Sequence, residues 1–183
     1  AQFGDIDNDG RADLFIAKGN VDQMPSNAIH DPNNLLMQQA DGSFVEKADV
    51  AGVATMARSR GAALADFDGD GLLDLVVVNR RAPMELYRNI TPATGHWLGI
   101  ALTQPGGNRD AIGAVVTVTA GNLVQDQQIS IGGGHAGGQA IPLHFGLGGA
   151  TAASITVRWP DGTTSPAIPA RLDSVMSIAK PAG

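Results

Sequence analysis

Two nonapeptides decide the fold expected of this chain: Asp5-Ile6-Asp7-Asn8-Asp9-Gly10-Arg11-Ala12-Asp13 and Asp66-Phe67-Asp68-Gly69-Asp70-Gly71-Leu72-Leu73-Asp74. Both read D-x-D-x-D-G-x-x-D, and they begin 61 residues apart. Together they hold eight of the 18 acidic residues of the chain. Four carboxylates within nine residues repel one another at neutral pH, so the pattern indicates that a bound cation holds each group together.

Calcium is the cation that fits this spacing, because it takes roughly six to eight oxygen ligands and accepts carboxylates and backbone carbonyls alike. Magnesium fits less well, since it takes few carboxylates and keeps several waters. The expected ligands are the carboxylates at loop positions 1, 3, 5 and 9 and the backbone carbonyl at position 7: Asp5, Asp7, Asp9, Arg11 and Asp13, and Asp66, Asp68, Asp70, Leu72 and Asp74. The sequence therefore predicts two Ca²⁺ sites, with two metal-free Asp-rich turns as the alternative.

Each loop leads into a short apolar run, Leu14-Phe15-Ile16-Ala17 in the first repeat and Leu75-Val76-Val77-Val78 in the second. These runs are rich in β-forming residues and predict buried strands. An EF-hand loop would instead need a glutamate at its twelfth position and a helix after it. The chain has Ile16 and Val77 at that position, so the loops are not EF-hands.

The stretch between the two loops predicts a hairpin. Residues 34–39 and 44–47 are the expected strands, and Asp41-Gly42-Ser43 is the turn between them. A repeat of about 60 residues with this content suits one four-stranded blade of a β-propeller.

The composition agrees with an all-β protein. The 183 residues include 16 aspartates but only 2 glutamates, together with 24 glycines, which argues against a bundle of long helices. The chain has no cysteine, so a disulfide scaffold and a cysteine nucleophile are excluded. Its formal charge of −6 argues against a nucleic-acid partner. No apolar run approaches the roughly 20 residues that span a membrane.

Residues 1–90 resemble FG-GAP/VCBS repeats, the calcium-loop blades of integrin α-type propellers. The resemblance is carried by both loops together with residues 3–5, 41–44 and 86–89. Residues 91–162 are similar to the ASPIC/UnbV domain, on the evidence of His96-Trp97-Leu98 and residues 108–114, 143–148 and 158–162. This order of repeats and domain is the arrangement of the cartilage acidic protein family and its bacterial relatives.

The resemblance implies an all-β fold: a partial calcium-binding propeller of two blades over residues 1–90, followed by a small β-sandwich or barrel-like domain over residues 91–183. Propellers of this type usually close with about seven blades, so we expect a part of a longer chain or of a larger complex. The first loop begins so close to Ala1 that the strand expected before it is missing from the pattern.

The C-terminal half is predicted to contain strands at residues 115–119, 127–131, 154–159 and 175–178, after a boundary at Pro92. Gly132, Gly134 and Gly137 match G-x-G-x-x-G, but an extended, proline-containing stretch follows where a nucleotide site needs a helix. We therefore expect a loop there rather than a nucleotide site.

The other chemically active residues give weak signals. The four histidines, at positions 30, 96, 135 and 144, lack zinc-site spacing; His144 is expected in a strand and His135 is a weak ligand candidate. We interpret Arg109-Asp110 as an ion pair or a turn contact in preference to an acid–base site. Trp97 and Trp159 read as packing residues, with a sugar-stacking platform as the alternative. Asn89-Ile90-Thr91 is formally a glycosylation sequon.

The predicted function is a non-catalytic, calcium-stabilised adhesion or structural module of a surface assembly. We expect an extracellular or periplasmic location and a protein or glycan partner. The alternatives left open are the C-terminal part of a polysaccharide-acting enzyme and a glycan-binding module without catalysis.

Overall fold

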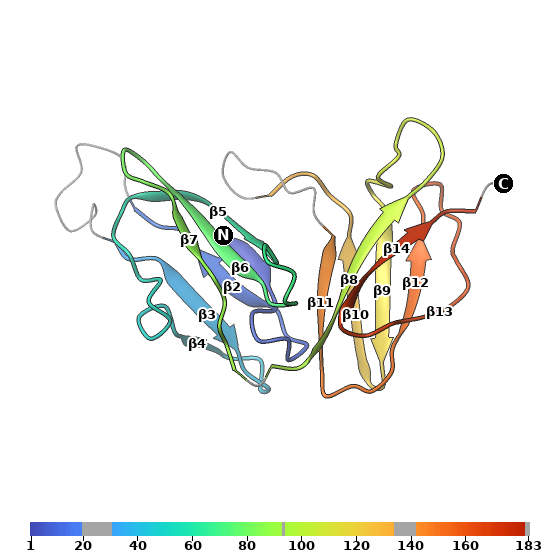
Figure 1. The fold of residues 1–183 in the computed structure, drawn as a ribbon, viewed down its shortest axis with the longest axis horizontal. Helices are drawn as coiled ribbons and strands as arrows, with labels where there is room; N and C mark the ends of the chain where they lie inside the picture. Colours follow the sequence, from blue (N-terminus) through green and yellow to red (C-terminus); the bar gives the residue numbers. More distant parts are fainter. Residues whose placement is uncertain (20–30, 93, 134–141, 182–183) are drawn as a thin grey trace. The chain divides into compact units, whose positions relative to one another are not determined.

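The computed structural model describes residues 1–19, 31–92, 94–133 and 142–181, and within them the protein is all-β, without a helix (Figure 1). His30, His135, Gly134 and Gly137 lie outside the described residues. The chain divides into two compact units, the first built mainly from Arg11–Thr91 and the second mainly from Pro92–Ile131 and the residues from 142 onward.

The first unit contains two small antiparallel sheets, each holding one of the Asp-rich loops between its first two strands. The strands of the first sheet, in spatial order, are β1 (Gln2–Gly4), β2 (Asp13–Ile16), β3 (Asn34–Gln38) and β4 (Phe44–Glu46). Those of the second are β5 (Ser59–Ala65), β6 (Asp74–Asn79) and β7 (Glu85–Tyr87). Such consecutive small meanders are consistent with propeller-type blades.

The expectation that no strand precedes the first loop is wrong. Gln2–Gly4 forms β1 and pairs with β2, with Gln2 opposite Phe15. Three residues are too few to show alternation in the sequence, but pairing along β2 and burial of Gln2 are enough to hold them. Gly4 lies against the second sheet, where a Cβ would stand 2.8 Å from a methyl of Leu64 and of Leu73.

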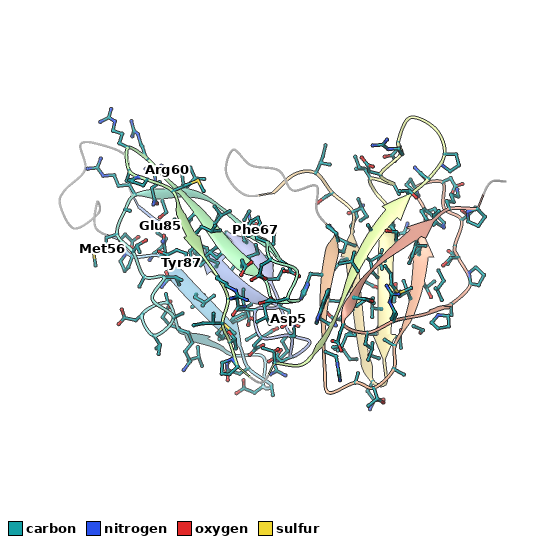
Figure 2. All side chains as sticks on the ribbon, viewed as in Figure 1. Asp5, Met56, Arg60, Phe67, Glu85 and Tyr87 are labelled. Carbon is teal, nitrogen blue, oxygen red and sulfur yellow. The ribbon has the colours of Figure 1, made fainter. Side chains whose placement is uncertain are left out.

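The two apolar runs after the loops contribute deeply buried side chains to the core of the first unit. Phe15 on β2 and Val77 on β6 are fully buried, as the patterns predict. The predicted hairpin is confirmed as β3 and β4. In its turn, the hydroxyl and the backbone N–H of Ser43 donate to Asp41 and lower the pKa of that carboxyl. Glu85 and Tyr87 both lie on β7 (Figure 2). Burial, followed by the charge of Glu85, raises the pKa of Tyr87.

The second unit is two sheets packed around one core, and in the described residues the strands form no closed barrel. One sheet has the order β10 (Leu123–Gln128), β9 (Val115–Ala120), β12 (Ser154–Arg158), β13 (Ile168–Pro169). The other has the order β11 (Leu143–Gly148), β8 (His96–Thr103), β14 (Ser174–Ala179). Fully buried residues of both sheets, such as Phe145 and Val157, meet in the core.

Three of the four strands predicted for this half are confirmed, and the one over residues 127–131 is misplaced. The strand is β10, which begins at Leu123 because Gly121-Asn122 turns the chain directly back onto β9. Gly121 supplies the positive φ (61°) that this tight turn needs. The eight-residue strand β8 was not predicted, although Leu98, Ile100 and Leu102 alternate along it.

Candidate metal centre

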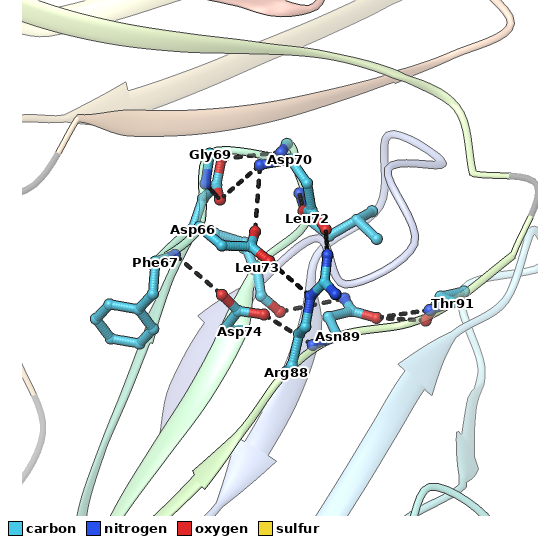
Figure 3. A network of polar contacts seen from close by, with 12 residues as sticks. Asp66, Phe67, Gly69, Asp70, Leu72, Leu73, Asp74, Arg88, Asn89 and Thr91 are labelled. Carbon is cyan, nitrogen blue, oxygen red and sulfur yellow. Dashed lines mark hydrogen bonds and ion pairs between the residues drawn. The ribbon is translucent and has the colours of Figure 1, made fainter.

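The second Asp-rich loop brings three of its four carboxylates together, among them Asp66 and Asp74 (Figure 3). Asp66, Asp68 and Asp74 each offer an oxygen, and these oxygens lie within 4.8 Å of one another. Asp74 is buried, Asp66 half-buried and Asp68 exposed, so the group opens from the sheet toward solvent. These residues occupy positions 1, 3 and 9 of the pattern.

Backbone N–H groups of the loop fix the carboxylate of Asp66. Its Oδ1 accepts from Gly69 N at 2.7 Å and from Asp70 N at 3.2 Å, and its Oδ2 accepts from Gly71 N at 2.9 Å. The loop can turn its amides inward because Gly69 and Gly71 have φ values of 78° and 88°. The first residue of the loop is therefore oriented before any ion binds.

Asp74 connects its loop to the third strand of the sheet. Its Oδ2 accepts from Phe67 N at 2.9 Å, and its Oδ1 accepts from Asn89 N at 2.7 Å. Each oxygen keeps a lone pair after this bond, so the carboxylate can still contribute to a cation site. Asp74 thus has a structural role in addition to its predicted ligand role.

The first loop repeats this arrangement with Asp5, Asp7 and Asp13, whose oxygens also lie within 4.8 Å of one another. Asp5 and Asp13 are buried. Asp13 Oδ2 accepts from Ile6 N and Asp13 Oδ1 accepts from Gln38 N, both at 2.8 Å.

The backbone of the two loops matches as well. Position 6 is glycine with positive φ in both, Gly10 at 91° and Gly71 at 88°, as the sequence predicts. Position 4 is also left-handed, with φ of 58° at Asn8 and 78° at Gly69. Asparagine and glycine are the residues that tolerate this conformation most readily, so position 4 was a readable signal that sequence reasoning missed.

The structure does not place the remaining predicted ligands in these groups. Asp9 and Asp70, at position 5, are outside the two sets of three converging carboxylates. Asp70 Oδ1 instead accepts from Leu72 N at 3.0 Å. The side chain of Arg11 donates from Nε to Gln38 O at 3.2 Å. That the carbonyls of Arg11 and Leu72 bind the ion stays a prediction.

The residues present fit a hard divalent cation. Among the described residues, Asp7 Oδ1 is buried and has no hydrogen-bond partner. A buried carboxylate oxygen without a partner is costly, and a cation coordinated by the group would satisfy it. The converging ligands are all carboxylate oxygens, which suit calcium and give no preference to zinc or copper.

The sequence did not indicate that Arg88 and Asn89, which lie next to the second loop, contact it. The guanidinium of Arg88 pairs with Asp68 at 2.6 Å and with Asp70 at 3.1 Å. The hydrogen bond to Asp70, followed by the charge of Asp68, raises the pKa of Arg88. Asn89 Nδ2 donates to Ile6 O of the first loop at 2.8 Å and to Leu73 O of the second at 3.1 Å.

The Asn89 contacts bear on the formal sequon. The nitrogen that would carry a glycan is the donor that joins the two loops, and Asn89 Oδ1 accepts from the hydroxyl of Thr91 at 2.6 Å. The motif is therefore used as a structural bridge in this fold.

The residues that gave only weak signals in the sequence make structural contacts. Arg109 and Asp110 are both exposed and form an ion pair at 3.7 Å, as expected. Trp159 is 2% exposed in the core of the second unit, which removes it as a sugar-stacking platform. Trp97 is half-buried and stacks on His144, with ring centroids 5.9 Å apart, and His144 lies in strand β11 as predicted. No helix in the described part of the chain is long and apolar enough to cross a membrane.

Comparisons with known proteins agree with the two halves. Residues 5–77 match the model of the FG-GAP-like repeat, and residues 104–183 match the model of ASPIC and UnbV. Cartilage acidic protein 1 of Xenopus tropicalis is 31% identical over 129 residues, which cover 68% of this chain and 20% of that protein. The Mus musculus and Homo sapiens proteins of that name are each 27% identical over 161 residues, or 86% of this chain. The chain spans about a fifth to a quarter of the length of these relatives.

Proposed function

Because the chain joins an FG-GAP-like repeat to an ASPIC and UnbV domain and is homologous to cartilage acidic protein 1, we propose that it is a structural or adhesion module of an extracellular or periplasmic assembly, stabilised by calcium. The relatives are named for cartilage, which agrees with a place outside the cell. A protein or glycan partner at a surface is part of this proposal, as is the absence of a catalytic role.

The observation that supports the calcium part is the convergence of positions 1, 3 and 9 in both loops, together with the buried, unpartnered Asp7 Oδ1. The same three positions meet in two loops of different flanking sequence, so the geometry belongs to the motif. When bound, calcium would neutralise the mutual repulsion of these carboxylates. Asp5 and Asp7 would hold it in the first loop with Asp13, and Asp66 and Asp68 in the second with Asp74.

The proposed role of the ion is architectural. A ligand that binds the folded state and not the unfolded chain adds its binding free energy to folding, about 2.7 kcal/mol when its concentration is a hundred times the dissociation constant. Extracellular calcium modules work at dissociation constants on the order of 10⁻⁴ to 10⁻³ M, so an exposed site such as that around Asp68 is of use in a calcium-rich compartment. Calcium would therefore hold the blades in shape for the partner-binding surface.

Thermal unfolding tests this proposal. The melting temperature is expected to rise with calcium over the micromolar to millimolar range, and to fall on addition of excess EDTA. Asp68→Ala should remove part of the calcium response with little effect in EDTA, because Asp68 is exposed and lies at the open side of its group. Asp49→Ala, an exposed aspartate outside both loops, is the matched control and should keep the full response. An unchanged melting curve with excess chelator would overturn the proposal.

A further inference from the structure

The guanidinium of Arg88 lies against two aspartates of the second loop, one of them Asp70 (Figure 3). Its Nε lies 2.6 Å from Asp68 Oδ2, and its Nη2 lies 3.1 Å from Asp70 Oδ2. Asp68 is also one of the three converging carboxylates, so the guanidinium and a bound cation would share a ligand residue. Asp70 is drawn toward Arg88 and stays outside the group of three.

The first repeat shows which residue this fold accepts at the same place. Leu14 pairs with Leu36 in the first sheet as Leu75 pairs with Tyr87 in the second, so Met37 is the equivalent of Arg88. Met37 is half-buried against the core of the first unit. A methionine at this strand position is therefore compatible with the blade.

Resting on the calcium sites proposed above, we propose that Arg88 sets the calcium affinity of the second loop by acting as a built-in counter-ion. Without calcium, the guanidinium offsets the repulsion between Asp68 and Asp70 and keeps the loop folded. With calcium, it competes with the ion for Asp68 and adds a positive charge next to it.

Arg88 is proposed to stabilise the calcium-free loop and to weaken calcium binding. A residue that only supports the fold would not weaken calcium binding, so the second effect identifies a counter-ion. Calcium affinity in oxygen-ligand loops follows the charge of the ligand set, so a neighbouring cation weakens binding. The Arg88 side chain is 64% exposed, so it loses few packing contacts when it moves into solvent on ion binding. Its exposure also means that salt screens the interaction, which keeps the effect moderate.

The test is calorimetric titration with calcium in an Asp7→Ala background, which disables the first loop and leaves the second to be measured. Arg88→Met, the residue of the first repeat, should lower the dissociation constant of the second loop roughly three- to tenfold. It should also lower the urea midpoint of the same protein in EDTA. Arg88→Lys keeps the charge and should stay within about twofold of the parent affinity. Arg88→Gln replaces Arg88→Met if the latter does not fold.

The outcomes separate the two proposals. If the unsubstituted protein takes up no calcium, the calcium sites fail and this inference fails with them. If calcium binds but Arg88→Met leaves the affinity unchanged or weakens it, only the role of Arg88 is overturned. Tighter binding by Arg88→Met and Arg88→Lys alike would also overturn it, because the effect would then not follow the charge.

Discussion

Asp13 and Asp74 accept matching pairs of backbone hydrogen bonds in the two repeats. One bond comes from the second residue of the aspartate's own loop, and the other from Gln38 or Asn89 at the end of the third strand. The last aspartate of each nonapeptide therefore ties the loop to a strand that lies well downstream in the sequence. This connection uses protein groups alone and does not depend on an ion.

Replacing Asp74 by alanine should destabilise the protein even when no calcium is present. The side chain is 2% exposed, and the substitution leaves the N–H groups of Phe67 and Asn89 without their charged acceptor. Hydrogen bonds to a charged group contribute about 1.5–3 kcal/mol each, so the loss of both bonds is expected to cost about 3–6 kcal/mol. Urea unfolding in excess EDTA measures it.

Asp68→Ala is the internal comparison for that experiment. It removes another carboxylate of the same group, but an exposed one, whose contact with the end of the third strand is an ion pair to the exposed Arg88 side chain. In EDTA it should change the unfolding free energy by less than about 1 kcal/mol. Equal losses for Asp74→Ala and Asp68→Ala would show that the backbone bonds of Asp74 contribute nothing of their own.

The metal loops could be read from the sequence because position, residue type and repetition all lie within nine residues. The connection made by Asp13 and Asp74 could not, because its second partner lies 25 residues downstream in one repeat and 15 in the other. The distance differs because the link between β2 and β3 is longer than that between β6 and β7. A contact whose spacing varies between repeats leaves no fixed pattern in one sequence.

The strands, too, could be predicted only where the signal was local in the sequence. β2 and β6 were predicted because each is a buried apolar run directly after a recognisable loop. β8 was missed because its polar and aromatic first residues, His96 and Trp97, hide the alternation that begins at Leu98. Arg88 was missed because an exposed arginine on a strand looks like a solvated residue until its partners are known. Local signals were readable, and partners from other strands were not.

Asn33 should be among the most sensitive polar positions of the first unit. It is 1% exposed; its Oδ1 accepts from Lys18 N at 2.9 Å and its Nδ2 donates to Thr55 Oγ1 at 3.1 Å. Asn33→Ala leaves Lys18 N and Thr55 Oγ1 without their hydrogen-bond partner. The substitution should lower the free energy of unfolding by about 2–4 kcal/mol, measured by chemical denaturation. The neighbouring Asn34→Ala, which removes one bond to Glu46 from a half-buried site, should cost less than about 1 kcal/mol. The reverse ranking would contradict this structure.

Gly99 on β8 has no room for a side chain because it lies opposite Val175 of β14. A Cβ at this position would stand 2.8 Å from Val175 Cγ2 and 3.4 Å from Val175 Cα. Gly99→Ala should therefore destabilise the protein by about 1–3 kcal/mol in urea unfolding. Gly107→Ala, where a Cβ meets nothing within 4 Å, is the control and should be near neutral.

A double substitution identifies the cause of that loss. Val175→Ala removes the Cγ2 methyl and leaves the 3.4 Å approach to Cα, so Gly99→Ala/Val175→Ala should recover about 1 kcal/mol relative to the sum of the single changes. Additive losses would mean that the Cγ2 methyl of Val175 is not the obstacle, and the explanation through this methyl would be wrong.

Glu46 should make the stability of the first blade depend on pH. Burial raises the pKa of this carboxyl, but hydrogen bonds from Ala48 N, Leu35 N and the Asn34 amide together lower it below its ordinary 4.5. A lowered pKa means that the ionised carboxyl stabilises the folded state above the unfolded-state pKa. That contribution is lost as the pH falls through the folded-state pKa.

Glu46→Gln isolates this contribution, because glutamine keeps the shape and one acceptor but cannot ionise. At pH 7 the variant should be less stable than the parent by under about 1 kcal/mol, since the side chain is exposed and its charge is screened. The difference should shrink steadily as the pH falls below 4.5, because the parent then loses its charge as well. Urea midpoints of both proteins in EDTA from pH 7 to about pH 3.5 measure it, and the aspartates that titrate in both cancel in the difference. A gap that stays constant over this range would show that Glu46 acts through its shape and not through its charge.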